Sequence, residues 1–218
     1  MPDFTTLRQR MVDNQIRPGS ITDYEVLKAF LAVPREDFVA AAEKPFAYAD
    51  RELRLPASGE ARAMMPSLQL ARMIQALPHG PEDKVLIVGC GTGYSAAILA
   101  LMAGRVIGLE EDAALASIAR SLLRPHANVA VTEGRLADGH AAEAPYDVVL
   151  IDGAVEIIPD ALVDQLKPGG FLATIERDDR LSRAMLYERV GEQAMRRPLF
   201  DAWAWVLPGF QRKREFVF

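Results

Sequence analysis

The chain has 218 residues, of which 50% are hydrophobic and 25% are charged, and it contains 15 glycines and 14 prolines. This length and composition allow a sizeable buried core and exclude a disulfide-stapled miniprotein, a disordered chain, collagen and a coiled coil. The formal net charge of -5 gives no net attraction to nucleic acid or to anionic lipid. We therefore expect one α/β domain, with neither nucleic acid nor a membrane as a partner.

Cys90 is the single cysteine of the chain, so no internal disulfide is expected. The sequence after Met1 has no basic leader followed by an apolar stretch, and no uninterrupted apolar run has the length of a membrane span. These features predict a cytoplasmic protein. His79, His126 and His140 lack the spacing of metal ligands, so we expect no metal site.

Residues 1–80 are predicted to be mostly helical. Apolar residues on one side of residues 5–16 indicate an amphipathic helix that Arg17-Pro18-Gly19 ends, and a second helix is expected from residue 22 to Pro34. Residues 45–65 show no strong period and are expected to be extended and partly irregular. Pro66 suits the first turn of a third helix, which is expected to reach Leu77. We expect this segment to cover the active site.

From residue 83 onward, short apolar strands alternate with helices. The expected strands are residues 84–89, 105–110, 128–132, 147–152 and 170–175, and the expected helices are residues 94–103, 112–123 and 159–166. This alternation predicts a mostly parallel twisted sheet with helices on both faces. Three further strands, at residues 185–190, 199–206 and 216–218, are expected to form an antiparallel edge. The domain then divides into a helical cover, residues 1–80, and a sheet core, residues 81–218.

Two tryptophans, Trp203 and Trp205, stand two residues apart in the second of these edge strands. Alternate residues of a strand lie on the same face, so both rings are expected on one face of the sheet. Packing against a helix is the expected role of these rings.

A glycine-rich turn is the most informative stretch of the sequence. The residues Gly89-Cys90-Gly91-Thr92-Gly93-Tyr94 follow a buried strand and open a helix, so a ligand can approach the main chain there. Glu110, followed by Glu111, ends the next strand about 20 residues later, the separation at which a carboxylate reaches ribose hydroxyls. Close packing of the glycines, a solvated strand end at Glu110 and Glu111, and an apolar filler role for Cys90 are the alternatives.

The spacing of the glycines selects among cofactors. The dinucleotide motif G-x-G-x-x-G requires glycine where this chain has Tyr94, and no Lys-Ser/Thr pair follows the turn, so a P-loop is excluded. A G-x-G-x-G turn with an acidic residue closing the second strand resembles the first motif of class I methyltransferases, which bind S-adenosylmethionine. The helix N-terminus at Gly93 would then face the carboxylate of the methionine moiety.

A wider resemblance covers most of the chain. The segments that carry it are Met11–Ile16, Val26–Leu27, Val33–Val39, Ala47–Asp50, Gly91–Ala100, Ala144–Asp147, Ile158–Pro159 and Gln165–Gly170. In these segments the chain resembles the protein-L-isoaspartate O-methyltransferases. The resemblance implies a Rossmann-like class I methyltransferase fold and S-adenosylmethionine as cofactor, with S-adenosylhomocysteine as product.

The resemblance also implies a reaction and an acceptor. The enzyme would transfer a methyl group to the free carboxylate of an isoaspartyl residue in a damaged protein or peptide. A carboxylate is already ionised at pH 7, so the reaction requires no general base. Alignment of the reactants and exclusion of water are expected to supply most of the acceleration.

Three segments depart from the family pattern. Arg62-Ala63-Met64-Met65 precedes Pro66 where the family has a Thr-Ile-Ser-Gln-Pro-like segment, so Met64 replaces the serine that donates to the acceptor. Gly134-Arg135-Leu136 stands where the family has Gly-Asp-Gly near the adenine, and Ile151-Asp152-Gly153-Ala154 replaces Val-Thr-Ala-Ala. The family's catalytic serine position therefore has no donor. The expected cofactor-binding residues are Gly89, Cys90, Gly91, Thr92, Gly93, Tyr94, Glu110, Glu111, Gly134, Arg135, Leu136 and Asp152.

Two hypotheses concern the residues that differ from the family pattern near the expected acceptor site. Arg62 would bind an anionic substrate bidentately, with Met64, Met65 and Pro66 lining an adaptable pocket; the alternative is a solvated loop cation beside core methionines. Asp152 would orient an acceptor or the cofactor amine, and the alternative is that it only shapes a turn.

Three functions remain open from the sequence. The first is methylation of isoaspartyl residues in proteins. The second is methylation of a different protein or small-molecule acceptor. The third is a catalytically silent module that binds S-adenosylmethionine.

Overall fold

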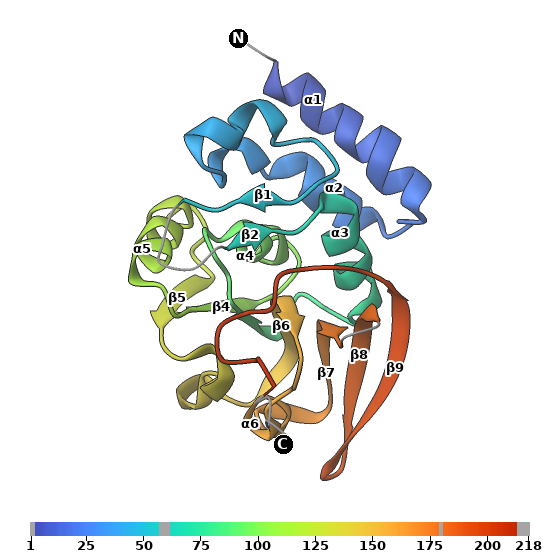
Figure 1. Cartoon of the computed structure of the whole chain (residues 1–218), viewed down its shortest axis with the longest axis vertical. Helices are drawn as coiled ribbons and strands as arrows, with labels where there is room; N and C mark the ends of the chain where they lie inside the picture. Colours follow the sequence, from blue (N-terminus) through green and yellow to red (C-terminus); the bar gives the residue numbers. More distant parts are fainter. Residues whose placement is uncertain (1–2, 57–61, 179–180, 213–218) are drawn as a thin grey trace, which may run out of the picture.

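The computed structural model describes residues 3–56, 62–178 and 181–212. A seven-stranded sheet in the order β5-β4-β3-β6-β7-β8-β9 forms its centre (Figure 1). The strands are β3 (Lys84–Val88), β4 (Arg105–Glu110), β5 (Val129–Glu133), β6 (Tyr146–Val155), β7 (Leu166–Arg177), β8 (Ser182–Val190) and β9 (Gln193–Asp201). The pairs from β5 to β7 are parallel, whereas β7, β8 and β9 pair antiparallel. The predicted α/β fold with an antiparallel edge is confirmed.

The strand order reverses between β3 and β6. The chain runs outward from β3 through β4 to β5, and it then returns to place β6 on the other side of β3. The connections after β3 and after β6 therefore diverge, and a crevice opens between them at the carboxyl ends of the strands. Val88 in β3 is in register with Ile151 in β6. The next residues, Gly89 and Asp152, therefore lie on the two sides of this crevice.

Helices connect the strands and form the N-terminal cover. The connecting helices are α4 (Tyr94–Leu99), α5 (Ala113–Leu122) and α6 (Asp160–Asp164); the cover contains α1 (Phe4–Met11), a π-helical continuation (Val12–Ile16), α2 (Tyr24–Ala32) and α3 (Ser67–Ala76). Three aspartates, Asp3, Asp23 and Asp112, accept hydrogen bonds from the first free N–H groups of α1, α2 and α5. These bonds stabilise the helix starts. No described helix has the length and apolar character needed to cross a membrane.

A short antiparallel pair lies between the N-terminal helices and the carboxyl edge of the sheet (Figure 1). Its strands are β1 (Leu53–Arg54) and β2 (Ala63–Met64), and Leu53 is paired with Met64. The segment predicted to be extended and partly irregular therefore contains two short paired strands. This β1–β2 pair brings the acceptor-side residues to the crevice.

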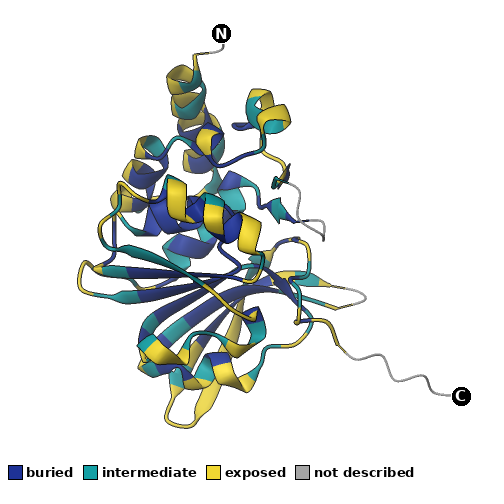
Figure 2. Ribbon diagram, turned by 90° about the vertical axis from the view of Figure 1, so that its left-hand side faces the viewer, coloured by how far each residue is buried: buried dark blue, intermediate teal, exposed yellow. Residues whose placement is uncertain are grey.

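The strands of the sheet are largely buried (Figure 2), and a cluster of buried apolar side chains packs on each face. One cluster joins the cover and α4 to the sheet, and it includes Phe30, Val85 and Ile98. The second cluster lies on the opposite face and includes Ile151 and Phe210. The cover is thus fixed to the sheet by a shared core, and it contributes to the walls of the crevice.

The C-terminal segment differs from the sequence prediction. The expected strand over residues 199–206 is wrong beyond Asp201, where β9 ends, and residues 216–218 lie outside the described residues. After Asp201 the chain turns back over β6, and Ala154 exchanges backbone hydrogen bonds with Trp205 and Leu207. This return places Leu207 against the backbones of Gly89 and Gly153.

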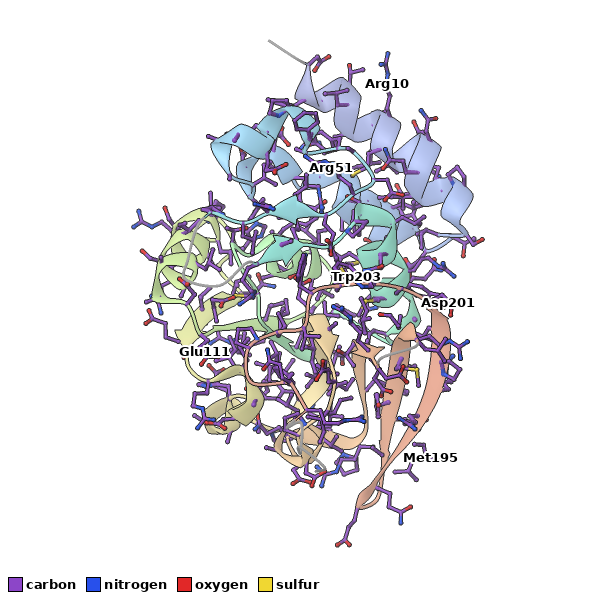
Figure 3. The ribbon with its side chains drawn as sticks, in the orientation of Figure 1. Arg10, Arg51, Glu111, Met195, Asp201 and Trp203 are labelled. Carbon is purple, nitrogen blue, oxygen red and sulfur yellow. The ribbon has the colours of Figure 1, made fainter. Side chains whose placement is uncertain are left out.

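The two tryptophans are consequently not part of a strand. Their rings still contact each other, with centroids 5.3 Å apart, and both side chains are exposed. Trp203 lies beside α3, where its backbone exchanges two hydrogen bonds with the amide of Gln69 (Figure 3). The contact with α3 is thus made by the backbone of Trp203, whereas its ring lies 4.8 Å from the guanidinium of Arg177, so the expected packing of the rings against a helix is wrong.

Leu207→Ala is expected to lower the free energy of unfolding by about 3 kcal/mol, because a buried leucine is lost and a cavity remains beneath Gly89 and Gly153. Urea denaturation measures the change. Leu181→Ala is the matched control, since Leu181 is 52% exposed, and a change within about 0.5 kcal/mol is expected there. Equal losses in the two variants would contradict the packing role of Leu207.

Candidate active site

The glycine turn after β3 has a backbone that only glycine adopts readily. Gly89, Gly91 and Gly93 have φ angles of 76°, 57° and 98°, in the region that other residues rarely occupy. A Cβ atom at Gly91 would lie 2.7 Å from Leu55 Cδ1, so this position also lacks space for a side chain. Backbone conformation and close packing therefore both require these glycines, and they leave main-chain atoms at the surface of the crevice.

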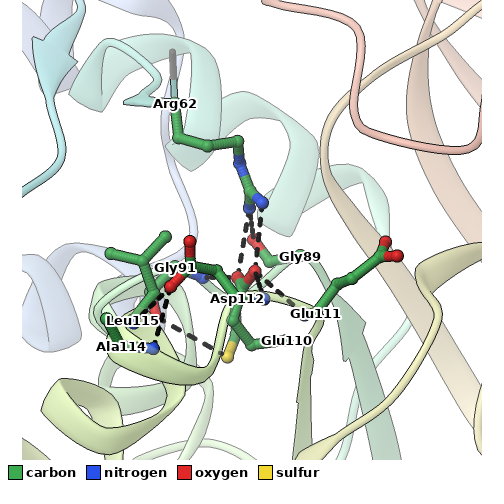
Figure 4. A network of polar contacts seen from close by, with 9 residues as sticks. Arg62, Gly89, Gly91, Glu110, Glu111, Asp112, Ala114 and Leu115 are labelled. Atoms are coloured by element: carbon green, nitrogen blue, oxygen red, sulfur yellow. Dashed lines mark hydrogen bonds and ion pairs between the residues drawn. The ribbon is translucent and has the colours of Figure 1, made fainter. Parts of the chain in front are cut away.

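Glu110, at the end of β4, ties this turn to the next one. Its side chain is fully buried. It accepts hydrogen bonds from the backbone N–H groups of Gly91 at 2.7 Å, Glu111 at 3.0 Å and Asp112 at 3.1 Å (Figure 4). The alternative of a solvated strand end is wrong for Glu110, whereas the side chain of Glu111 is exposed.

Arg62, the residue directly before β2, reaches the same carboxylate. Its Nη1 donates to Oε1 of Glu110 at 3.0 Å, and its Nη2 donates to Oε2 at 3.1 Å and to the carbonyl of Gly89 at 3.2 Å (Figure 4). Both partners of this ion pair are buried. Arg62 is therefore not a solvated loop cation, and its guanidinium faces Glu110 rather than an open acceptor pocket.

A small pocket lies beside this ion pair. Its walls come from the β1–β2 pair, the glycine turn, the start of α4 and β6. The lining residues are Leu55, Arg62, Ala63, Met64, Gly89, Cys90, Gly91, Thr92, Tyr94 and Asp152. The structure thus gathers most of the cofactor and acceptor residues predicted from the sequence around one cavity.

Asp152 supplies a carboxyl group to the pocket from within β6. The alternative that it only shapes a turn is wrong, because β6 continues to Val155. Burial raises the pKa of Asp152, and the nearby positive charges of Arg62 and Arg35 oppose this rise. Burial also raises the pKa of the Cys90 thiol. Cys90 is therefore an unreactive buried group, as its filler role predicted.

The remaining predicted residues lie around the pocket rather than in its wall. Met65 and Pro66 follow Met64 into the start of α3. The turn after β5 starts at the same edge of the sheet, since the N–H of Gly134 donates to the backbone carbonyl of Glu110 at 3.1 Å. In that turn Arg135 is exposed and Leu136 is fully buried.

Arg35 is a residue near the site to which the sequence assigned no role. It is fully buried, its Nη2 donates to the carbonyl of Met65 at 2.7 Å, and its guanidinium lies 4.8 Å from the centre of the Tyr94 ring. Burial lowers the pKa of Arg35 and raises that of Tyr94. Arg35 therefore connects the acceptor segment to α4. The charged run Arg35-Glu36-Asp37 gave no signal that its first member is buried.

Comparison with known proteins relates this arrangement to one family. The family model described as protein-L-isoaspartate(D-aspartate) O-methyltransferase matches residues 6–200. A protein-L-isoaspartate O-methyltransferase from Koribacter versatilis is 42% identical over 174 residues, which cover 78% of this chain and 77% of that protein. The chain belongs to the protein-L-isoaspartate O-methyltransferase family. The resemblance inferred from the sequence is confirmed.

Other relatives extend the match over the whole chain and its fold. Protein-L-isoaspartate O-methyltransferase 1 from Syntrophobacter fumaroxidans is 33% identical over 219 residues, covering 94% of this chain and 99% of that protein. A solved protein-L-isoaspartate O-methyltransferase superposes with a TM-score of 0.83 at 23% identity, covering 93% of this chain and 66% of that one. A Plasmodium falciparum structure of the same description, in complex with S-adenosyl-L-homocysteine, has a TM-score of 0.76 at 20% identity, covering 95% and 99%. The class I methyltransferase fold is confirmed.

The cofactor of this family, S-adenosylmethionine, fits the residues at the carboxyl edge of the sheet. The glycine turn lines the pocket, and Glu110 is a buried acceptor at the tip of the second strand, where the ribose hydroxyls of such cofactors bind. Arg62 donates hydrogen bonds to both carboxylate oxygens of Glu110. The ribose hydroxyls can therefore bind Glu110 only if Arg62 releases these oxygens.

Gly91→Ala is expected to weaken binding of S-adenosylhomocysteine at least about tenfold, because a Cβ atom meets Leu55 and the N–H group that holds Glu110 is displaced. Isothermal titration calorimetry measures the affinity. The matched control is Gly191→Ala in the β8–β9 turn, where φ is also positive, at 65°, and no atom lies within 4 Å of the added Cβ. An equal loss of affinity in both variants would show that only global strain is being measured.

Proposed function

We propose that this family member transfers the methyl group of S-adenosylmethionine to the free carboxylate of an isoaspartyl residue in a protein or peptide. The observation that supports this most directly is the continuity of the family match over residues 6–200. This range includes the cover and the β1–β2 pair, which form the acceptor side of the pocket, as well as the cofactor turn. A cytoplasmic location belongs to the same proposal.

The geometry suits a reaction that needs placement more than proton transfer. The bound cofactor supplies an electrophilic sulfonium methyl group, and an ionised carboxylate attacks it without a general base. The chain itself contributes alignment and a dry environment. Leu55 and Met64 give the pocket apolar walls on the side of the β1–β2 pair.

We assign roles to the residues around the pocket on the same basis. The glycine turn and Glu110 hold the methionine and ribose parts of the cofactor. Gly134, Arg135 and Leu136 border the adenine, because their turn begins at the backbone of Glu110. Asp152 orients the cofactor amine or the acceptor, since it lines the pocket directly beside the glycine turn.

A second candidate is a different carboxylate acceptor. Met64, which stands where the family pattern has a hydroxyl donor, is buried and lines the pocket. A thioether cannot donate a hydrogen bond. The acceptor carboxylate would then be recognised by the guanidinium of Arg62 together with the apolar wall.

The assignment is tested by measuring transfer of a radiolabelled methyl group to an isoaspartyl peptide and to the same peptide with normal aspartate. Transfer only to the isoaspartyl peptide is expected, because the family reaction requires the relocated free carboxylate. S-adenosylhomocysteine binding, measured in parallel, separates the alternatives. Binding of S-adenosylhomocysteine without methyl transfer to the isoaspartyl peptide would refute the isoaspartyl assignment. It would favour the second candidate if another carboxylate is methylated, and a silent module if none is.

Restoring the hydroxyl tests whether Met64 limits the isoaspartyl reaction. Met64→Ser is expected to raise kcat/KM for the isoaspartyl peptide about tenfold, since a hydrogen bond to a charged group contributes about 1.5 kcal/mol. Met64→Ala makes a similar truncation without a donor and is the matched control. The same kcat/KM in both variants would show that the serine hydroxyl has no partner in this pocket.

A further inference from the structure

Glu110 has no free hydrogen-bonding capacity. Its Oε1 accepts from Arg62 Nη1, Glu111 N and Asp112 N, and its Oε2 accepts from Arg62 Nη2 and Gly91 N. An ionised carboxylate offers about four lone-pair positions. The two hydroxyls of a ribose therefore cannot bind Glu110 while all five donors remain.

Arg62 is the donor that is able to leave. The three backbone donors belong to the turns after β3 and β4, which are part of the sheet edge. Among the described residues, Arg62 is the only side chain that donates to Glu110, and it directly precedes β2, a strand of only two residues. Rotation of one long side chain frees two sites on the carboxylate without moving the sheet.

We propose that Arg62 is a competitive gate: it occupies the ribose-binding carboxylate, is displaced when the cofactor binds, and then holds the carboxylate of the acceptor. The second step rests on the proposed carboxylate methylation. Cofactor binding would thereby create the acceptor site, so that the two substrates bind in a fixed order with the cofactor first.

The energetics of the ion pair allow this exchange. A buried Arg–Glu pair gains Coulombic energy but loses the hydration of both charges, so its net contribution is small. Ribose hydroxyls replace the two donors that Glu110 loses. Arg62 loses its buried partner at the same time, and a displaced guanidinium in this position requires a new anion.

In the proposed gate, the carboxylate of the acceptor would be that anion. Arg62, Met64 and Asp152 line the same cavity, so the guanidinium remains beside the acceptor position after it leaves Glu110. A guanidinium binds a carboxylate with two parallel hydrogen bonds. Arg62 would thus provide the donors that Met64 lacks.

The competition is tested by titrating S-adenosylhomocysteine, which carries the ribose but no reactive methyl group. Arg62→Met keeps an unbranched apolar stem and removes the guanidinium with its charge. We expect this variant to bind S-adenosylhomocysteine about tenfold more tightly than the wild type. This factor corresponds to a wild type in which Arg62 occupies Glu110 in about nine tenths of the molecules, a competing state that the variant lacks. Unchanged or weaker binding would overturn the gate.

The matched control is Arg54→Ala, which removes an exposed cation from β1 in the same strand pair and should leave the affinity unchanged. Arg62→Lys keeps the charge and loses the two-pronged geometry, so an intermediate affinity is expected. Thermal unfolding of each variant confirms that it is folded.

The second step is tested by the binding of an isoaspartyl peptide to the full chain. Wild-type protein is expected to bind the peptide at least about tenfold more tightly with saturating S-adenosylhomocysteine than without it, and Arg62→Met should lose this enhancement. Equal peptide affinity with and without S-adenosylhomocysteine would overturn the order of binding. Absence of methyl transfer by the wild type would refute the proposed function, whereas the calorimetric comparison of Arg62→Met with the wild type would still decide the gate.

Discussion

The buried carboxylate of Glu110 is the interaction on which the rest of the site depends. A carboxylate removed from water has to be paired and hydrogen-bonded, because its hydration is lost. Glu110 meets this requirement through the backbone of two turns and the guanidinium of Arg62. One side chain thereby joins the ends of β3 and β4 to the N-terminal cover. This junction holds Arg62 and the glycine turn at the pocket.

The C-terminal segment supports the junction from the opposite side. Leu207 packs against Gly89 and Gly153, and backbone hydrogen bonds with Ala154 hold the segment along β6. The glycine turn is therefore confined between this segment and Leu55 of the cover. Preorganisation of this kind reduces the ordering that a bound cofactor must otherwise impose.

The acceptor side combines the family architecture with a different set of polar groups. A neutral hydroxyl donor is replaced by Met64, while Arg62 and Asp152 bring charges of opposite sign to the same pocket. A cation binds a carboxylate more strongly than a hydroxyl does, but it also requires a counterion when no substrate is present. Glu110 serves as that counterion here. In the proposed gate, recognition of the acceptor and binding of the cofactor are linked through this one arginine.

Local sequence patterns determined much of the fold and the location of the site. Buried apolar runs ended by glycine or by an acidic residue predicted the central strands, and the spacing of Gly89, Gly91 and Glu110 predicted the cofactor position, because these features depend on neighbours along the chain. The partner of Arg62 lies 48 positions away, and the two alternating tryptophans suggested a strand that the return over β6 prevents. Periodicity reports which side of a segment is buried but not which distant segment covers it. Only the tertiary structure therefore decided that Arg62 faces Glu110, that Arg35 is buried, and that residues 202–207 leave the sheet.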